Sequence, residues 1–121
     1  PFLLPPNAIP GVSARYAKPG DIITIYGIGF GSVLDSGNQD IPSGTLVPGA
    51  SKLSNSFSMD FGGVAVNLSA ANTYFGLAPN LIGIYQFNVV VPNVPNNDLV
   101  PLTFKLNGTS GTQTLFIAVH N

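Results

Sequence analysis

The chain has 121 residues, of which 45% are hydrophobic and 7% are charged, and its formal net charge is −1. This length suits one domain with its own core. The charge balance lacks the basic surface that nucleic acids and anionic lipids require, so we expect no nucleic-acid partner. No apolar run approaches the ~20 residues of a spanning helix, so we expect no membrane span. Cysteine is absent, so no disulfide indicates the redox compartment.

The first 14 residues differ in composition from the rest of the chain. They contain four prolines and no charged residue, a composition that favours extended or polyproline geometry. The start lacks Met and a basic region, and we expect a mature or excised terminus. We divide the chain into a Pro-rich arm, 1–14, and a domain, 15–121. The apolar residues of the arm, which must pack on their own domain or on a neighbour, are Phe2, Leu3, Leu4, Ile9 and Val12.

The next residues predict a strand followed by a long loop. Pro19-Gly20 indicates a turn, and 21–26 is rich in β-branched and aromatic residues, as strands are. The glycines of 27–31 predict a bend out of this strand. Residues 32–55 contain repeated turn residues, and loops of such length are often functional.

The clearest hairpin follows this loop. Apolar and polar residues alternate through 57–61 and again through 64–68, with Gly62-Gly63 as the turn between them. Residues 72–77 are expected to form a short connector or strand.

The remaining residues continue the β pattern to the end of the chain. Residues 82–91 predict a long strand that Pro92–Asn97 closes, and 102–106 and 115–119 alternate on either side of an Asn107-Gly108 turn. No stretch has a sustained helical period. We therefore predict an all-β protein, an immunoglobulin-like antiparallel β-sandwich of about seven to nine strands with an extended Pro-rich N-terminal arm.

Three stretches, 18–31 (KPGDIITIYGIGFG), 74–92 (YFGLAPNLIGIYQFNVVVP) and 100–108 (VPLTFKLNG), carry a family resemblance. The chain resembles the Solibacter-type C-terminal domain family of secreted acidobacterial proteins, and it is more distantly similar to TIG-type immunoglobulin-like domains. The resemblance covers about residues 15–119 and is weakest in 32–55. It implies an immunoglobulin-like sandwich, export, and a place at the C-terminal end of a longer protein. It implies no catalytic residues.

Candidate groups for catalysis are few. Nucleophilic catalysis needs a base beside the nucleophile, and the one histidine, His120, is next to the end of the chain, where termini usually fray. The five Asp residues form no recognisable pair for glycoside hydrolysis. Gly27–Gly31 lacks the helix and the Lys of a phosphate-binding loop. We assign no catalytic residue and no cofactor, and predict that the protein is not an enzyme.

One loop offers oxygen ligands. Asp35, Asn38 and Asp40 lie close together in the sequence and could supply a weak Ca²⁺ site. Their spacing differs from that of an EF-hand, and Asp and Asn are also common turn formers. We therefore assign no metal site. If calcium binds, these three residues are the candidate ligands.

Aromatic residues raise the possibility of a carbohydrate-binding surface. Four tyrosines, at 16, 26, 74 and 85, would form a sugar-stacking platform if coplanar and exposed. Tyr26 and Tyr85 lie in apolar strands, where packing with a bonded hydroxyl is the ordinary role.

Two functional interpretations follow. The first is an extracellular structural module, the repeated subunit of a surface filament held by inter-subunit contacts of the arm. The second is a surface binding or spacer domain that recognises carbohydrate or protein, at the C-terminal end of a larger secreted protein. The expected partners are further copies of the chain or another extracellular protein.

Overall fold

A computed structural model describes residues 2–47 and 49–121, and all of its regular elements are β-strands. The predicted all-β class and antiparallel sheets are confirmed. The ten strands are β1 (Ile22–Gly27), β2 (Val33–Leu34), β3 (Lys52–Leu53), β4 (Phe57–Phe61), β5 (Val64–Ala65), β6 (Tyr74–Leu77), β7 (Tyr85–Val90), β8 (Asn97–Leu106), β9 (Thr109–Ser110) and β10 (Leu115–Val119).

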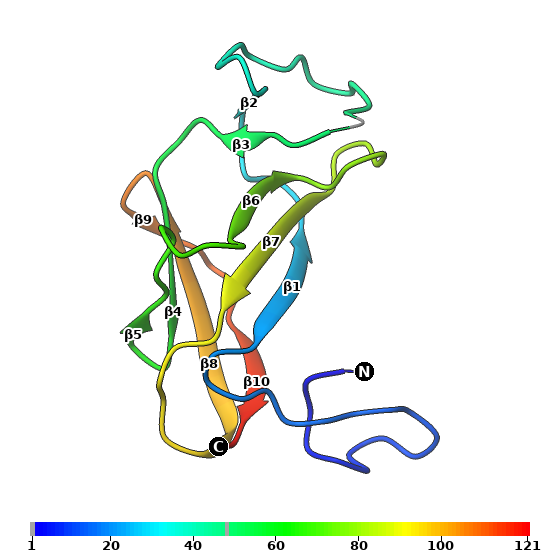
Figure 1. Cartoon of the computed structure of the whole chain (residues 1–121), viewed down its shortest axis with the longest axis vertical. Coiled ribbons are helices and arrows are strands. Elements are labelled where there is room, and N and C mark those ends of the chain that lie inside the picture. Colours follow the sequence, from blue (N-terminus) through cyan, green and yellow to red (C-terminus); the bar gives the residue numbers. More distant parts are fainter. Residues whose placement is uncertain (1, 48) are drawn as a thin grey trace.

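Two main sheets form the body of the molecule (Figure 1). One has the strand order β1-β7-β6, and the other has the order β10-β8-β4-β5, with β9 also paired to β8. A separate two-stranded ribbon, β2-β3, lies beyond β6 at the end of the molecule opposite the chain termini (Figure 1). The strand count exceeds the predicted seven to nine because β2, β3, β5 and β9 have two residues each.

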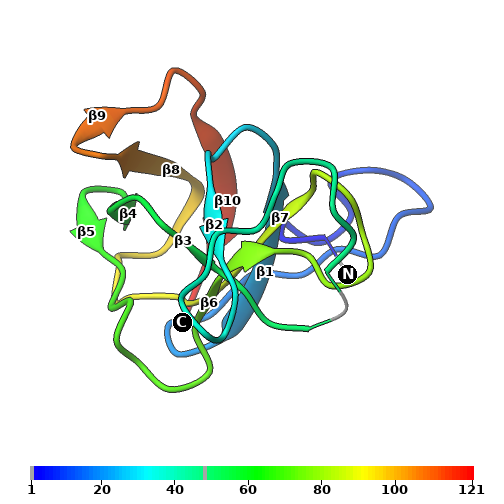
Figure 2. The same ribbon diagram turned by 90° about the horizontal axis from the view of Figure 1, so that it is seen from above.

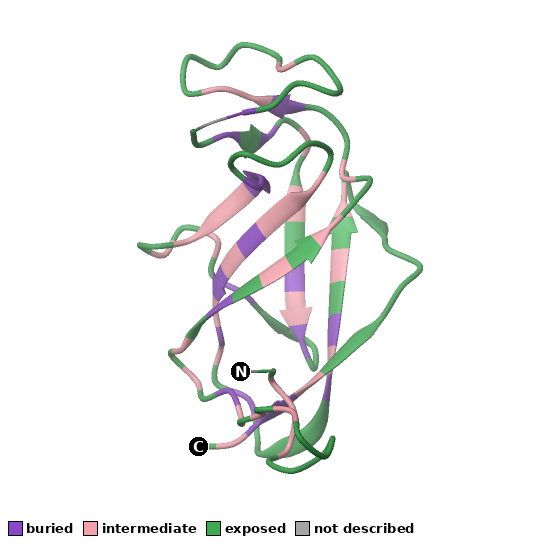
Figure 3. Cartoon of the chain, turned by 90° about the vertical axis from the view of Figure 1, so that its right-hand side faces the viewer, coloured by how far each residue is buried: buried purple, intermediate pink, exposed green. Residues whose placement is uncertain are grey.

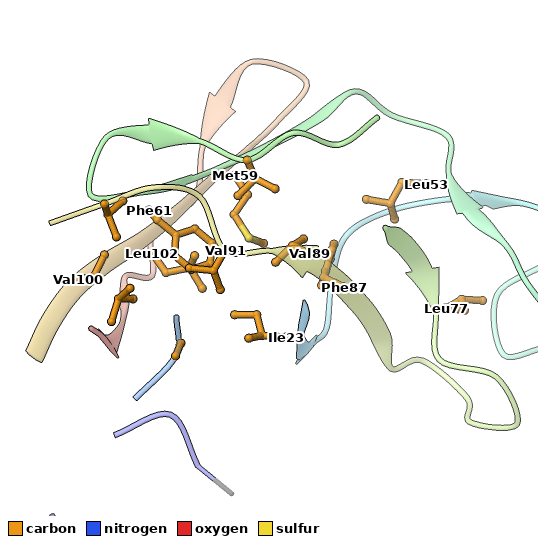
Figure 4. Packing of buried hydrophobic residues seen from close by; sticks show 14 of the residues in the cluster. Ile23, Leu53, Met59, Phe61, Leu77, Phe87, Val89, Val91, Val100 and Leu102 are labelled. Atoms are coloured by element: carbon orange, nitrogen blue, oxygen red, sulfur yellow. The ribbon is translucent and has the colours of Figure 1, made fainter. Parts of the chain in front are cut away.

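The core lies between the two main sheets (Figure 4). Side chains alternate across each strand, and one face of β7 supplies Phe87 and Val89, which are 1% and 0% exposed. From the facing sheet, Met59, Phe61 and Leu102 are buried against them. Figure 3 shows this alternation as bands of buried and exposed residues along the strands.

Both predicted two-residue turns are confirmed. Gly62 and Gly63 have φ of 58° and 85°, and Asn107 and Gly108 have φ of 52° and 76°. Positive φ at both central residues is the type I′ conformation, whose twist matches that of the flanking strands and which Gly and Asn adopt most readily.

The bend predicted after the first strand is also present. The chain leaves β1 at Gly27, and the ring of Phe30 turns into the space between the sheets. There it packs edge-on to Phe87 and tilted against Phe104, with ring centroids 4.7 and 5.2 Å away. The glycine-rich segment therefore lets an aromatic side chain fill one end of the core.

Three predicted strand boundaries were wrong. The return strand of the hairpin, expected over 64–68, ends at Ala65. The strand expected over 82–91 begins at Tyr85, because residues 78–84 form a connection with left-handed backbone at Asn80 and Gly83. The strand expected over 102–106 begins at Asn97. Sequence reasoning missed its first half because Pro101 argues against a central strand.

The position of Pro101 explains why β8 tolerates it. The β4–β8 register ends at Phe61–Leu102, where β4 enters its turn. The Pro101 carbonyl oxygen accepts a hydrogen bond from the Gly62 N–H at 2.8 Å. The proline nitrogen faces the same side, past the last paired residue of β4, so no ladder bond is lost.

The long predicted loop, 32–55, is anchored at its base by β2-β3 and by a polar network. Ser51 is 7% exposed, and its hydroxyl accepts a hydrogen bond from the Leu77 N–H at 2.9 Å. The Tyr74 hydroxyl lies 3.2 Å from the Ser51 hydroxyl and donates to the Leu77 carbonyl at 2.6 Å. These bonds hold the end of the loop against β6, where Gly76 has the Ser51 backbone directly beside it.

We predict that Gly76→Ala destabilises the fold by about 1–3 kcal/mol, the usual cost of overpacking. A methyl group at Gly76 would lie 2.4 Å from the Ser51 carbonyl oxygen, which is backbone and cannot rotate away. The matched control is Gly49→Ala, where nothing lies within 4 Å. Thermal unfolding of both variants measures the difference, and equal stability of the two would contradict the packing described here.

Candidate functional site

The two main sheets have unpaired edges on the same side of the sandwich. β1 pairs with β7 on its inner edge, and none of the described strands pairs with its outer edge. β10 pairs with β8, and in the described part of the chain the outer edge of Leu115–Ile117 likewise lacks a partner strand. Figures 1 and 2 show β1 and β10 side by side in both views. The sandwich is therefore open along this side.

The opposite edges are protected. The five-stranded sheet ends in β5, which has two residues, and very short edge strands discourage association. The three-stranded sheet ends in β6, which the Ser51 network covers. Natural proteins also guard exposed edges with charged residues, yet β1 (IITIYG) and β10 (LFIAV) carry none. The open edges are thus mostly apolar and carry no charge.

An apolar groove of about 500 Å³ runs between these two edges. Ile22–Ile25 of β1 form one wall and Leu115–Ile117 of β10 form the other, with Leu102 between them. A second cavity of about 200 Å³ continues toward Phe30 and shares Ile25, Leu102 and Leu115 with the first. Together they form one seam, which we call the β1–β10 seam.

Large apolar side chains lie exposed along the seam. Ile22 of β1 is 50% exposed and Phe116 of β10 is 53% exposed. Monomeric soluble proteins seldom expose contiguous apolar surface of this kind unless something binds there. The seam is therefore the strongest candidate for an interaction surface.

The arm reaches one end of this seam. Phe2, Leu3 and Leu4 line the groove, and the Leu3 carbonyl oxygen accepts a hydrogen bond from the Ala118 N–H of β10 at 3.2 Å. Of the predicted arm residues, Leu3 packs against the core, and Leu4 and Val12 are half-buried. Phe2 and Ile9 are exposed, Phe2 at 65%.

The chain folds back between the arm and β1. Phe2 donates from its N–H to the Ser13 carbonyl and accepts from the Arg15 N–H, at 3.0 and 2.9 Å. Between these contacts Asn7 and Gly11 have left-handed backbone. The extended arm predicted from the prolines is therefore a folded-back segment, because two tight turns interrupt it.

A charged pair fixes the turn that enters β1. The Asp21 carboxylate accepts hydrogen bonds from the Lys18 N–H and from the Arg15 guanidinium, both at 3.0 Å. The backbone N–H of Lys18 and the adjacent Arg15 lower the pKa of Asp21. Arg15 also lines the groove, so this ion pair lies beside the seam.

His120 is better ordered than its place near the terminus suggested. Its ring stacks on Tyr16, with centroids 3.8 Å apart, and its Nε2 lies 2.7 Å from the Asp98 carboxylate. Its N–H donates to the Ala17 carbonyl at 2.9 Å. These contacts join the last residues of the chain to the start of the domain.

The calcium candidate residues lie in a tight turn. One Asp35 carboxylate oxygen accepts hydrogen bonds from the N–H groups of Gly37 and Gln39, at 2.8 and 3.0 Å. Asn38 has φ of 60°. These bonds account for Asp35 and Asn38 as turn formers. Among the residues described, no group of three or more His, Cys, Asp or Glu gathers in metal-binding geometry.

The four tyrosines have separate roles. Tyr16 stacks on His120, and the hydroxyls of Tyr74 and Tyr85 bond to backbone, that of Tyr85 to the Gly31 carbonyl. The prediction of a bonded hydroxyl is confirmed for Tyr85. Tyr26, for which packing in the core or at a strand edge was expected, lies on the edge strand β1, lines the cavity beside Phe30 and is 61% exposed.

No protein-family model, curated protein or solved structure matches the chain. No helix in the described ranges is long and apolar enough to cross a membrane.

We predict that Asp21→Asn lowers stability near pH 7 by about 0.5–1 kcal/mol, as expected for a partly exposed pair. The folded-state pKa of Asp21 lies below its unfolded value, so the charged carboxylate stabilises the fold at neutral pH. This contribution is lost as pH falls through the unfolded and then the folded pKa, below about pH 4.

Urea unfolding at about pH 7 and at about pH 3 measures the change. Asp60→Asn is the control, since Asp60 takes part in no ion pair within 2–47 and 49–121. A stability difference between wild type and Asp21→Asn that is as large at the lower pH as near pH 7 would contradict the assignment.

Proposed function

We propose that the protein is a non-catalytic, extracellular structural module, the repeated subunit of a surface filament held by contacts of the N-terminal arm. The observation that carries the proposal is the β1–β10 seam, where two uncharged edges flank an apolar groove. Exposed strand edges pair readily with another chain. A subunit that had to remain monomeric would be expected to cover or charge them.

The strand order supports an immunoglobulin-like type for this module. Such domains have sheets A-B-E-D and G-F-C, extended in some by C′. Here β1-β7-β6 corresponds to B-E-D, and β10-β8-β4-β5 corresponds to G-F-C-C′. The short parallel bridge between Ala17 and Val119 connects the first residues of the domain to the strand equivalent to G. The seam then occupies the place where strand A would pair with strand B.

The chemistry of the chain supports a binding role over a catalytic one. Its charged residues are sparse. The groove of the seam is lined mainly by aliphatic and aromatic residues, together with Thr24 and Arg15. Arg15 is already paired with Asp21. The resemblance to secreted acidobacterial domains, together with this surface, supports export and membership of that family as part of the proposal.

A second candidate function is recognition of carbohydrate or protein by a surface binding or spacer domain. It rests on a hollow of about 310 Å³ at the base of loop 32–55. Ser32, Ser43, Thr45 and Tyr85 are among the residues that line it. Aromatic and hydroxyl-bearing residues suit sugars, and the hollow shares no lining residue with the seam.

The test compares the full chain with a variant that lacks residues 1–14. We expect the full chain to form oligomers at micromolar concentration and the truncated chain to be monomeric, measured by light scattering. Phe2→Ser/Leu4→Ser provides a milder variant. Each apolar side chain removed forfeits at most about 1.5–3 kcal/mol, so association should weaken by about tenfold or more.

Circular dichroism checks that each variant remains folded. A monomeric full chain whose residues 1–14 are cleaved rapidly by protease would contradict the assembly proposal. A glycan array that gives specific binding, abolished by changes in the 32–55 hollow, would favour the second candidate.

A further inference from the structure

We infer that the β1–β10 seam is the receptor for the first arm residues, Phe2–Leu4, of a second copy of this chain. The inference rests on the proposed assembly function and identifies the two surfaces that meet. The exchange would replace contacts that the chain's own arm makes in the structure by contacts of the same kind between two copies.

The chain's own contacts show that the arm fits this surface. Phe2, Leu3 and Leu4 line the groove together with Ile22 and Phe116. The Leu3 carbonyl accepts from the Ala118 N–H, which is main-chain pairing with the edge of β10. Neither Phe2–Leu4 nor the walls from β1 and β10 carry a charge. The donor segment and its acceptor are therefore matched in chemistry.

Residues 5–13, within the arm, form a hinge that can open. In the folded-back state, Ala8 N–H bonds to the Pro5 carbonyl and Val12 N–H bonds to the Ile9 carbonyl. Opening these two turns frees residues 5–13, which extend to about 30 Å at ~3.3 Å per residue. That reach lets Phe2–Leu4 move away from their own groove, and prolines in the hinge favour the extended form.

The seam is longer than the part that the chain's own arm covers. Phe2–Leu4 line the larger groove, whereas the cavity beside Phe30, Tyr26 and Gln113 has no arm residue among its lining. An arm that arrives from a second copy is not tied to the fold-back at Ser13 and Arg15 and can lie further along β1. Additional apolar burial there favours the exchanged form over the folded-back form.

The exchange also predicts the kind of assembly. The arm and the seam are different surfaces of one chain, so the contact is heterologous. Such contacts form rings where the rotation closes and open filaments where it does not. A filament subunit needs one donor and one acceptor surface, and this chain has both.

The test uses cysteine pairs, because the natural chain contains none. A tagged Phe2→Cys chain is co-expressed with an untagged Thr24→Cys chain, and a short bismaleimide links thiols that lie close together. Both residues line the groove. Leu4→Cys is a second donor variant, in case Phe2→Cys assembles poorly. The control acceptor is Ser58→Cys, an exposed position on β4.

We expect a tagged–untagged product with Thr24→Cys that exceeds the Ser58→Cys product by about tenfold, since docking raises the effective thiol concentration. Light scattering reports oligomer formation separately. Oligomers with no excess product at Thr24 from either donor would overturn the inference and leave the assembly function intact. Monomers that give no tagged–untagged product at Thr24 from either donor would overturn both.

Discussion

The structure depends on one constraint, the burial of apolar side chains between two sheets whose edges are protected on one side of the sandwich and open on the other. Phe87 and Val89 are fully enclosed, so the core itself is complete. Ile22 and Phe116, at the edges of the same sheets, remain half-exposed. The hydrophobic driving force is therefore satisfied at the centre of the sandwich and unsatisfied along the β1–β10 seam. That imbalance gives the molecule a surface to offer to another chain.

The low charge of the chain and the open seam reinforce one another. Charged edge residues would keep copies apart by repulsion and by the cost of desolvation, and the two open edges lack them. The Arg15–Asp21 ion pair lies beside the seam, and its two charges cancel. The turn it stabilises sets where β1 begins and hence where the groove starts. The ion pair therefore helps to position a surface that is itself apolar.

Sequence patterns predicted the local features well, because turns and alternation depend on neighbouring residues. Gly62-Gly63 and Asn107-Gly108 each needed only left-handed backbone at two positions. The first half of β8 was missed because Pro101 is tolerated only through the end of β4, a non-local circumstance. The Ser51–Tyr74 network joins residues 23 positions apart. The apolar arm residues were identified, but the seam arises from strand order in space, which alternation alone does not fix.

In the proposed exchange, the arm of a second copy competes with the chain's own arm for the groove. A segment attached to its own domain has a high effective concentration for its own groove, so exchange succeeds only if the exchanged form gains something further. Identical contacts at Ala118 would provide no gain. The uncovered cavity beside Phe30 would, because it adds apolar surface that the folded-back arm does not line. In the proposed exchange, the balance between this apolar gain and the entropy of association would set the concentration at which copies join.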